Sequence, residues 1–171
     1  MIIYIVLLFL LSFSVISDLK ASKIRNVYVL PAAVIGLVSN ALFYGFTGLK
    51  FSVMGMTLPI LSLGIFFYAG LIGAGDIKLF GAIGALLGLR FLIYAMAYSF
   101  LFAGLSAFIS LARRGEIKST FFGFYQEMKM CYLTCDILHF QNKSTRHVIK
   151  LSPAIAIGVG FHILLSTTLY Y

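Results

Sequence analysis

Long apolar stretches, separated by short polar or glycine-containing breaks, run through almost the whole chain. A helix that spans a membrane needs about 20 consecutive apolar residues, with a range of roughly 17–25. Stretches near this length, and one shorter one, predict six transmembrane helices over residues 1–17, 27–46, 51–72, 77–89, 91–112 and 151–169. The pattern therefore predicts an all-α fold: a polytopic membrane helix bundle, with residues 1–171 as a single integral membrane domain.

The composition supports a membrane protein. Hydrophobic residues make up 61% of the chain and charged residues 11%, whereas soluble domains have about 45–50% apolar and about 25% charged residues. The net charge of +8 would also suit a nucleic-acid-binding protein, but in a membrane protein basic residues collect in cytoplasmic loops. No nucleic-acid partner is predicted.

The basic residues are distributed unevenly between the two ends of the predicted helices. With the N-terminus outside, eleven of the 13 Lys and Arg residues fall in three cytoplasmic segments, at about 18–26, 73–78 and 113–150, and Lys50 and Arg90 fall outside. This asymmetry predicts an N-out, C-out topology. No Lys or Arg precedes the first apolar stretch, so we expect a retained helix and not a cleaved signal peptide.

Two of the five acidic residues of the chain lie next to apolar stretches: Asp18 follows the first stretch, and Asp76 lies between the third and the fourth. In the predicted topology both lie at the same depth, on the cytoplasmic side. An ionisable group at membrane depth is costly, which makes it a candidate for function. Two adjacent carboxyl groups share a proton and suit acid–base chemistry on a peptide bond. Because Asp76 is predicted at a helix N-terminus and Asp18 at a helix C-terminus, we expect Asp76 to be the ionised base and Asp18 the acid.

The residues next to Asp76 form a candidate active-site loop. Gly73 and Gly75 are expected to let this loop adopt positive φ and to let a substrate backbone approach. Lys78 is a candidate to keep Asp76 ionised or, more simply, an anchor of the positive-inside type.

Three motifs of the chain, in the same order, resemble those of the type IV prepilin peptidases. Gly73-Ala74-Gly75-Asp76 is similar to the GxGD motif of that family. Residues 18–26 are similar to the segment that follows the family's other aspartate, with Arg25 in place of the usual proline, and Pro153-Ala154-Ile155-Ala156-Ile157-Gly158 is similar to the segment that opens the last helix.

The resemblance implies a membrane aspartic endopeptidase that cleaves the basic leader from type IV prepilins or prepilin-like proteins at the cytoplasmic face of the inner membrane. It implies Asp18 and Asp76 as catalytic residues, water as the nucleophile, and neither a metal nor an organic cofactor. The implied partners are a prepilin or pseudopilin with a hydrophobic N-terminal helix, and the lipid bilayer. The chain lacks the cysteine-rich cytoplasmic region of the long forms, so it resembles the short, peptidase-only form.

Simpler interpretations of the two aspartates remain open. Asp76 would also suit a helix N-cap, and Asp18 a solvated residue beyond a helix end. A proton-coupled transporter would use the acid pair as a relay, and a non-catalytic assembly factor of a pilus or secretion system would not need the acids.

Several other polar residues of the chain are candidates for function. Cys131, Cys135 and His139 share a helical face but offer three ligands where zinc prefers four, so we favour buried positions on an interfacial amphipathic helix. Among the acids of the same connection, Glu116, Glu127 and Asp136 would attract a basic leader. His162 is expected to form a hydrogen bond with a neighbouring helix.

Overall fold

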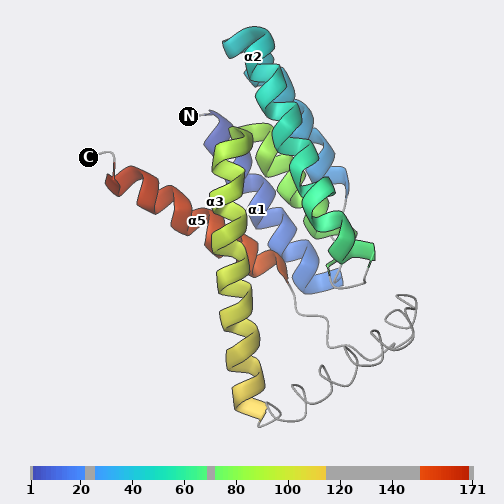
Figure 1. The fold of residues 1–171 in the computed structure, drawn as a ribbon, viewed down its shortest axis with the longest axis vertical. Helices are drawn as coiled ribbons and strands as arrows, with labels where there is room; N and C mark the ends of the chain where they lie inside the picture. Colours follow the sequence, from blue (N-terminus) through green and yellow to red (C-terminus); the bar gives the residue numbers. More distant parts are fainter. Residues whose placement is uncertain (1, 22–25, 69–71, 115–150, 170–171) are drawn as a thin grey trace.

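The computed structural model describes residues 2–21, 26–68, 72–114 and 151–169, and almost all of them are helical. The four helices are α1 (Ile2–Ala21), α2 (Asn26–Tyr68), α3 (Ala74–Arg114) and α5 (Leu151–Leu169) (Figure 1). Each contains a segment long and apolar enough to cross a membrane: Ile3–Lys20, Val27–Tyr68, Ala74–Ser110 and Leu151–Thr168. The all-helical class is thus confirmed, with four helices in the described residues where the sequence predicted six.

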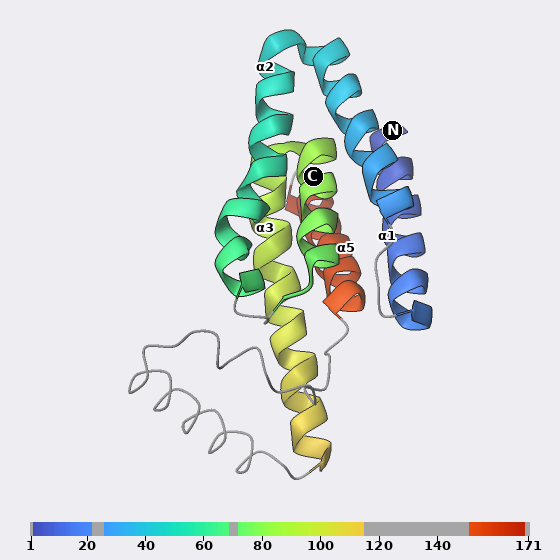
Figure 2. The same cartoon turned by 90° about the vertical axis from the view of Figure 1, so that its right-hand side faces the viewer.

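Two of the four helices are interrupted at a glycine, and the chain reverses direction there (Figure 2). Gly45 in α2 has φ 61° and ψ −145°, and Gly88 in α3 has φ 81° and ψ 176°. Positive φ is strained for residues with a Cβ atom, so glycine suits both reversals. The two arms of α2 correspond to the predicted helices 27–46 and 51–72, and those of α3 to 77–89 and 91–112.

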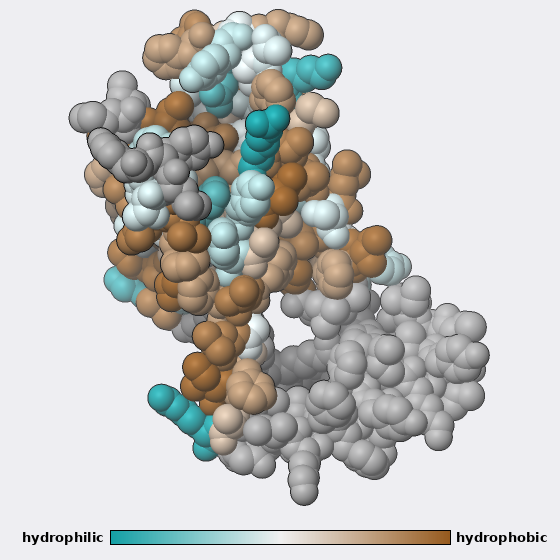
Figure 3. All heavy atoms as spheres, turned by 60° about the vertical axis from the view of Figure 1, so that its left-hand side comes forward, coloured by the Kyte–Doolittle hydropathy of each residue, from teal (hydrophilic) through white to brown (hydrophobic). Residues whose placement is uncertain are grey.

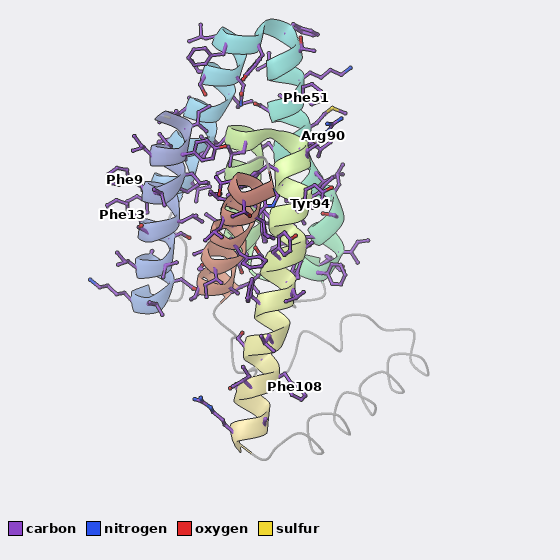
Figure 4. All side chains as sticks on the ribbon, turned by 90° about the vertical axis from the view of Figure 1, so that its left-hand side faces the viewer. Phe9, Phe13, Phe51, Arg90, Tyr94 and Phe108 are labelled. Carbon is purple, nitrogen blue, oxygen red and sulfur yellow. The ribbon has the colours of Figure 1, made fainter. Side chains whose placement is uncertain are left out.

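The first arm of α3 forms the centre of the bundle. Leu79, Phe80, Ile83 and Leu86 on this arm are at most 1% exposed. The outward faces of the helices instead carry large apolar side chains, such as Phe9 and Phe13 on α1 (Figure 4). The described surface is correspondingly apolar over most of the visible face (Figure 3). Such a surface suits lipid as the solvent and is rare on soluble monomers, which indicates an integral membrane protein.

The second arm of α3 is longer than the first and extends beyond the ends of the other helices (Figures 1 and 4). Phe108, 63% exposed, lies on this extension. The predicted amphipathic segment that follows it, within residues 115–150, lies outside the described residues.

Small residues allow α2 and α5 to pack closely on α3. A Cβ atom on Gly55 of α2 would overlap the carbonyl group of Gly84 on α3, and a Cβ on Gly84 would overlap that of Gly55. A Cβ on Gly158 of α5 would lie 2.5 Å from the backbone nitrogen of Ser99. Close backbone approach through small residues is a common means of association between membrane helices, where water provides no hydrophobic drive.

A polar cluster connects the two glycine reversals. Asn40 and Ser52, on opposite arms of α2, are hydrogen-bonded to each other at 2.8 Å. Asn40 Nδ2 also donates to the carbonyl oxygens of Ala85 (3.0 Å) and Leu86 (3.2 Å), and the Ser52 hydroxyl donates to that of Ala85 (2.9 Å). These carbonyls lie in the last turn before Gly88, where a helix leaves its carbonyl groups without helical partners. The cluster therefore satisfies polar groups that the reversal frees.

Replacing Asn40 with alanine is expected to destabilise the protein by about 1–3 kcal/mol, because the carbonyl groups lose donors in an apolar environment. The thermal unfolding temperature in detergent would measure the loss. Ser39→Ala is the matched control, since the Ser39 hydroxyl donates locally to the Ile35 carbonyl at 2.7 Å. Equal unfolding temperatures for the two variants would contradict this role of Asn40.

Candidate active site

Asp76 lies in the first turn of α3, on a helix start formed by Gly73. The Gly73 carbonyl accepts hydrogen bonds from the backbone N–H groups of Asp76 (3.1 Å) and Ile77 (3.4 Å). In return, the Asp76 carboxylate accepts a hydrogen bond from the Gly73 N–H. The bond from the Gly73 N–H to the acid three residues later is one half of a capping box, and the other half is missing because glycine has no side chain. The sequence thus fixes the orientation of the Asp76 side chain through its own helix start.

The glycines of this motif act differently from the prediction. Positive φ occurs at Gly45 and Gly88 in the described backbone, and not at Gly73 or Gly75, so the predicted positive-φ loop is wrong. Gly75 is already within α3, because the helix begins at Ala74 and not at Ile77. Gly73 instead leaves room for the carboxylate: a Cβ atom there would lie 3.2 Å from Asp76 Oδ2, so the carboxylate would have to shift by a few tenths of an ångström.

Asp18 lies in the last turn of α1, not beyond the helix end as the apolar pattern predicted. The residue is buried, with 9% of its surface exposed. Its Oδ2 atom is fully enclosed and has no hydrogen-bond partner in the described part of the chain. Its burial excludes the solvent-exposed position expected beyond the helix end. A buried polar atom without a protein partner is also uncommon.

The structure brings these two acids together. Asp18 comes from the end of α1 and Asp76 from the start of α3, and both helix ends lie at the same end of the bundle (Figures 1 and 2). The Asp18 carboxyl group is close enough to act on Asp76 as a neighbouring like charge. Two acids 58 positions apart in the sequence therefore lie near each other.

Lys78 lies two residues beyond Asp76, on the exposed side of the first turns of α3. Lys20 is also exposed, at the end of α1. Two exposed lysines therefore lie on the helix ends that carry the acids, whereas Lys50 and Arg90 lie close in sequence to the two glycine reversals.

Sequence reasoning missed two buried serines. Ser14 on α1 and Ser152 on α5 are both fully buried, and neither hydroxyl has a partner in the described residues. For Ser14 a signal existed, since it lies one turn before Asp18 and shares its helix face. For Ser152 there was none, because its burial depends on how α5 packs.

Other candidates from the sequence lie outside the described residues: Cys131, Cys135, His139, Glu116, Glu127 and Asp136. Within residues 2–21, 26–68, 72–114 and 151–169, no group of three or more His, Cys, Asp or Glu side chains could hold a metal ion.

His162 contacts the neighbouring helix through ring packing. Its imidazole lies 4.6 Å from the ring of Phe91, 5.3 Å from that of Tyr94 and 5.8 Å from that of Tyr98, measured between centroids. Tyr94 lies on the second arm of α3, one turn from Arg90 (Figure 4). This cluster joins α5 to α3 and contains neither aspartate.

Comparison with protein families gives one match. Residues 4–108 match the model of the type IV leader peptidase family. Neither a curated protein nor a solved structure matches the chain. The matched range covers more than half of the sequence and includes Asp18, Gly73 and Asp76. The chain therefore belongs to the type IV leader peptidase family.

Proposed function

We propose that this protein is an aspartic endopeptidase that removes the basic leader from type IV prepilins or prepilin-like proteins, with Asp18 and Asp76 as its catalytic residues. The observation that carries the proposal is the approach of these two carboxyl groups from separate helices. Family membership supports a leader peptidase, and the pair supplies chemistry suited to peptide hydrolysis.

The proposed topology has six membrane-crossing segments, with both termini outside and the active site on the cytoplasmic side of the inner membrane. The reversals at Gly45 and Gly88 support it, because they give α2 and α3 two antiparallel arms each. The distribution of basic residues supports the orientation.

In the proposed reaction, a water molecule bound between the carboxyl groups attacks the carbonyl carbon of the scissile peptide bond. The ionised carboxylate takes a proton from this water, while the protonated carboxyl group donates its proton to the carbonyl oxygen. The resulting tetrahedral intermediate collapses when the C–N bond breaks and a proton passes to the leaving nitrogen. The products are a new carboxyl end on the leader and a free amino group on the mature protein.

The surroundings of the two acids favour different roles. Asp76 lies at the N-terminus of α3, where the helix dipole favours a carboxylate, and Asp18 lies in the last turn of α1, where the dipole disfavours one. We therefore propose Asp76 as the base and Asp18 as the acid in the resting enzyme.

The decisive experiment is cleavage of a prepilin by the purified full-length protein in liposomes. The substrate would carry a basic leader followed by a hydrophobic helix, and mass spectrometry would identify the new amino terminus. We expect one cut at the leader boundary, with no metal or cofactor added and with chelator present. No cleavage by protein that is folded in the liposomes would overturn the proposal and favour a transporter or an assembly factor.

Gly73→Ala is expected to lower kcat/KM about tenfold, because the new methyl group displaces the Asp76 carboxylate and small misplacements of reacting groups are costly. Initial cleavage rates would measure this effect. Gly104→Ala is the matched control, since a Cβ at Gly104 meets nothing within 4 Å. Equal rates for the two variants would remove Gly73 from the proposed active site.

A further inference from the structure

Three buried oxygen atoms on α1 and α5 lack hydrogen-bond partners in the described part of the chain: Ser14 Oγ, Asp18 Oδ2 and Ser152 Oγ. Their residues are 0%, 9% and 0% exposed, respectively. More than nine in ten buried polar groups in proteins are hydrogen-bonded. Three such atoms on two contacting helices therefore indicate a polar site.

The positions of the three residues support a single site. Ser14 and Asp18 are four residues apart on α1, so their side chains are neighbours on one helix face. Since both are buried, this face points into the bundle. Helix α5 contacts α1 and begins beside its C-terminal half (Figures 1 and 2). Ser152 is the second residue of α5.

Ser14 also differs from other helical serines of this chain. The hydroxyl groups of Ser39, Ser62 and Ser99 donate to the carbonyl oxygen four residues earlier, at 2.7, 2.8 and 2.6 Å. Leu10 offers such a carbonyl to Ser14 on the same helix, but the Ser14 hydroxyl does not bond to it. Its hydrogen-bonding capacity thus remains available for another partner beside Asp18.

We propose that Ser14, Asp18 and Ser152 form a buried water-binding pocket, and that the two serines are positioning residues for the Asp18 carboxyl group. A buried water typically makes about three hydrogen bonds, and these three oxygen atoms supply that number. Such a water fixes the rotation of the Asp18 carboxyl group relative to Asp76. The inference rests on the proposed function and extends it to two residues outside the acid pair.

The test measures prepilin cleavage by full-length protein in liposomes for Ser14→Ala, Ser152→Ala and Ser152→Thr. Each alanine variant is expected to lower kcat about tenfold with KM unchanged, in line with loss of one hydrogen bond in the network that holds the Asp18 carboxyl group. Ser152→Thr is expected to restore most of kcat, because it keeps the hydroxyl. The matched control is Ser99→Ala, a buried serine whose hydroxyl bonds within its own helix, which should leave kcat unchanged.

The unfolding temperatures of the serine variants distinguish a loss of activity through misplacement of the Asp18 carboxyl group from a loss through a destabilised fold. Removing these hydroxyls is expected to leave the unfolding temperature equal or higher, since no protein partner loses a hydrogen bond. If one alanine variant does not fold, the other decides the outcome. Wild-type kcat in both alanine variants would overturn the pocket, as would equal losses of kcat in Ser152→Ala and folded Ser152→Thr. In either case an inactive Asp18→Asn would leave the proposed function standing. Full activity of Asp18→Asn would overturn both.

Discussion

Prepilin cleavage is expected to fall by at least about 1000-fold when either Asp18 or Asp76 is replaced with asparagine. Positioned acid–base groups contribute roughly 10²–10⁴-fold each, and asparagine keeps the size of the side chain while removing its ability to exchange a proton. In the proposed mechanism the two carboxyl groups act as one unit, so the double variant should be no slower than either single variant. Single-turnover cleavage in liposomes would measure all three rates.

Asp136→Asn is the matched control for this loss, since Asp136 is the third aspartate of the chain and is not part of the proposed pair. We expect its single-turnover rate at saturating substrate to equal that of the wild type, since a residue that attracts the leader affects binding and not the chemical step. Retention of a tenth or more of the wild-type rate by either Asp18→Asn or Asp76→Asn, in protein with normal unfolding behaviour, would contradict a two-aspartate mechanism.

Gly55→Val and Gly84→Val are each expected to destabilise the bundle by about 3 kcal/mol or more, at or above the upper end of ordinary overpacking. The added Cβ atom overlaps a backbone carbonyl of the opposite helix, and backbone cannot rotate aside as a flexible side chain can. The two arms would have to separate, which opens the contact between α2 and the centre of the bundle. Thermal unfolding followed by size-exclusion chromatography in detergent would measure the effect.

Gly64→Ala on the same helix provides the control, because a Cβ at Gly64 meets nothing within 4 Å. Alanine is favoured over glycine in a helix by up to about 1 kcal/mol, so this variant should be equally or more stable. An unfolding temperature of Gly55→Val equal to that of Gly64→Ala would exclude the close approach at Gly55.

Hydropathy located the apolar segments well because lipid exposure imposes a long, nearly continuous apolar run on each of them. It could not locate helix ends that carry charge. Asp18 and Lys20 continue α1, and Gly75 and Asp76 already belong to α3, since a helix is set by backbone hydrogen bonds and these run past the last apolar residue.

Glycine was the other source of error. One residue type allows reversal at Gly88, close helix contact at Gly84 and room for a carboxylate at Gly73. The sequence alone does not distinguish these uses, because each depends on what packs opposite. The two aspartates were recognisable from their cost in an apolar chain, whereas Ser152 was not, since a serine gains significance here only through complete burial.

The unequal arms of α3 have a consequence for how water would reach the two aspartates. From Ala74 to Leu87 the first arm is about 21 Å long at 1.5 Å per residue, shorter than a hydrocarbon layer of about 30 Å. This arm is buried at the centre of the bundle, so the other helices and not lipid surround it. Asp76 lies at the beginning of this arm, and in the proposed topology so short an arm leaves its carboxyl group within the depth of the hydrocarbon layer. The packing of the surrounding helices, and not the bilayer, must then leave a path for the water that the proposed reaction consumes.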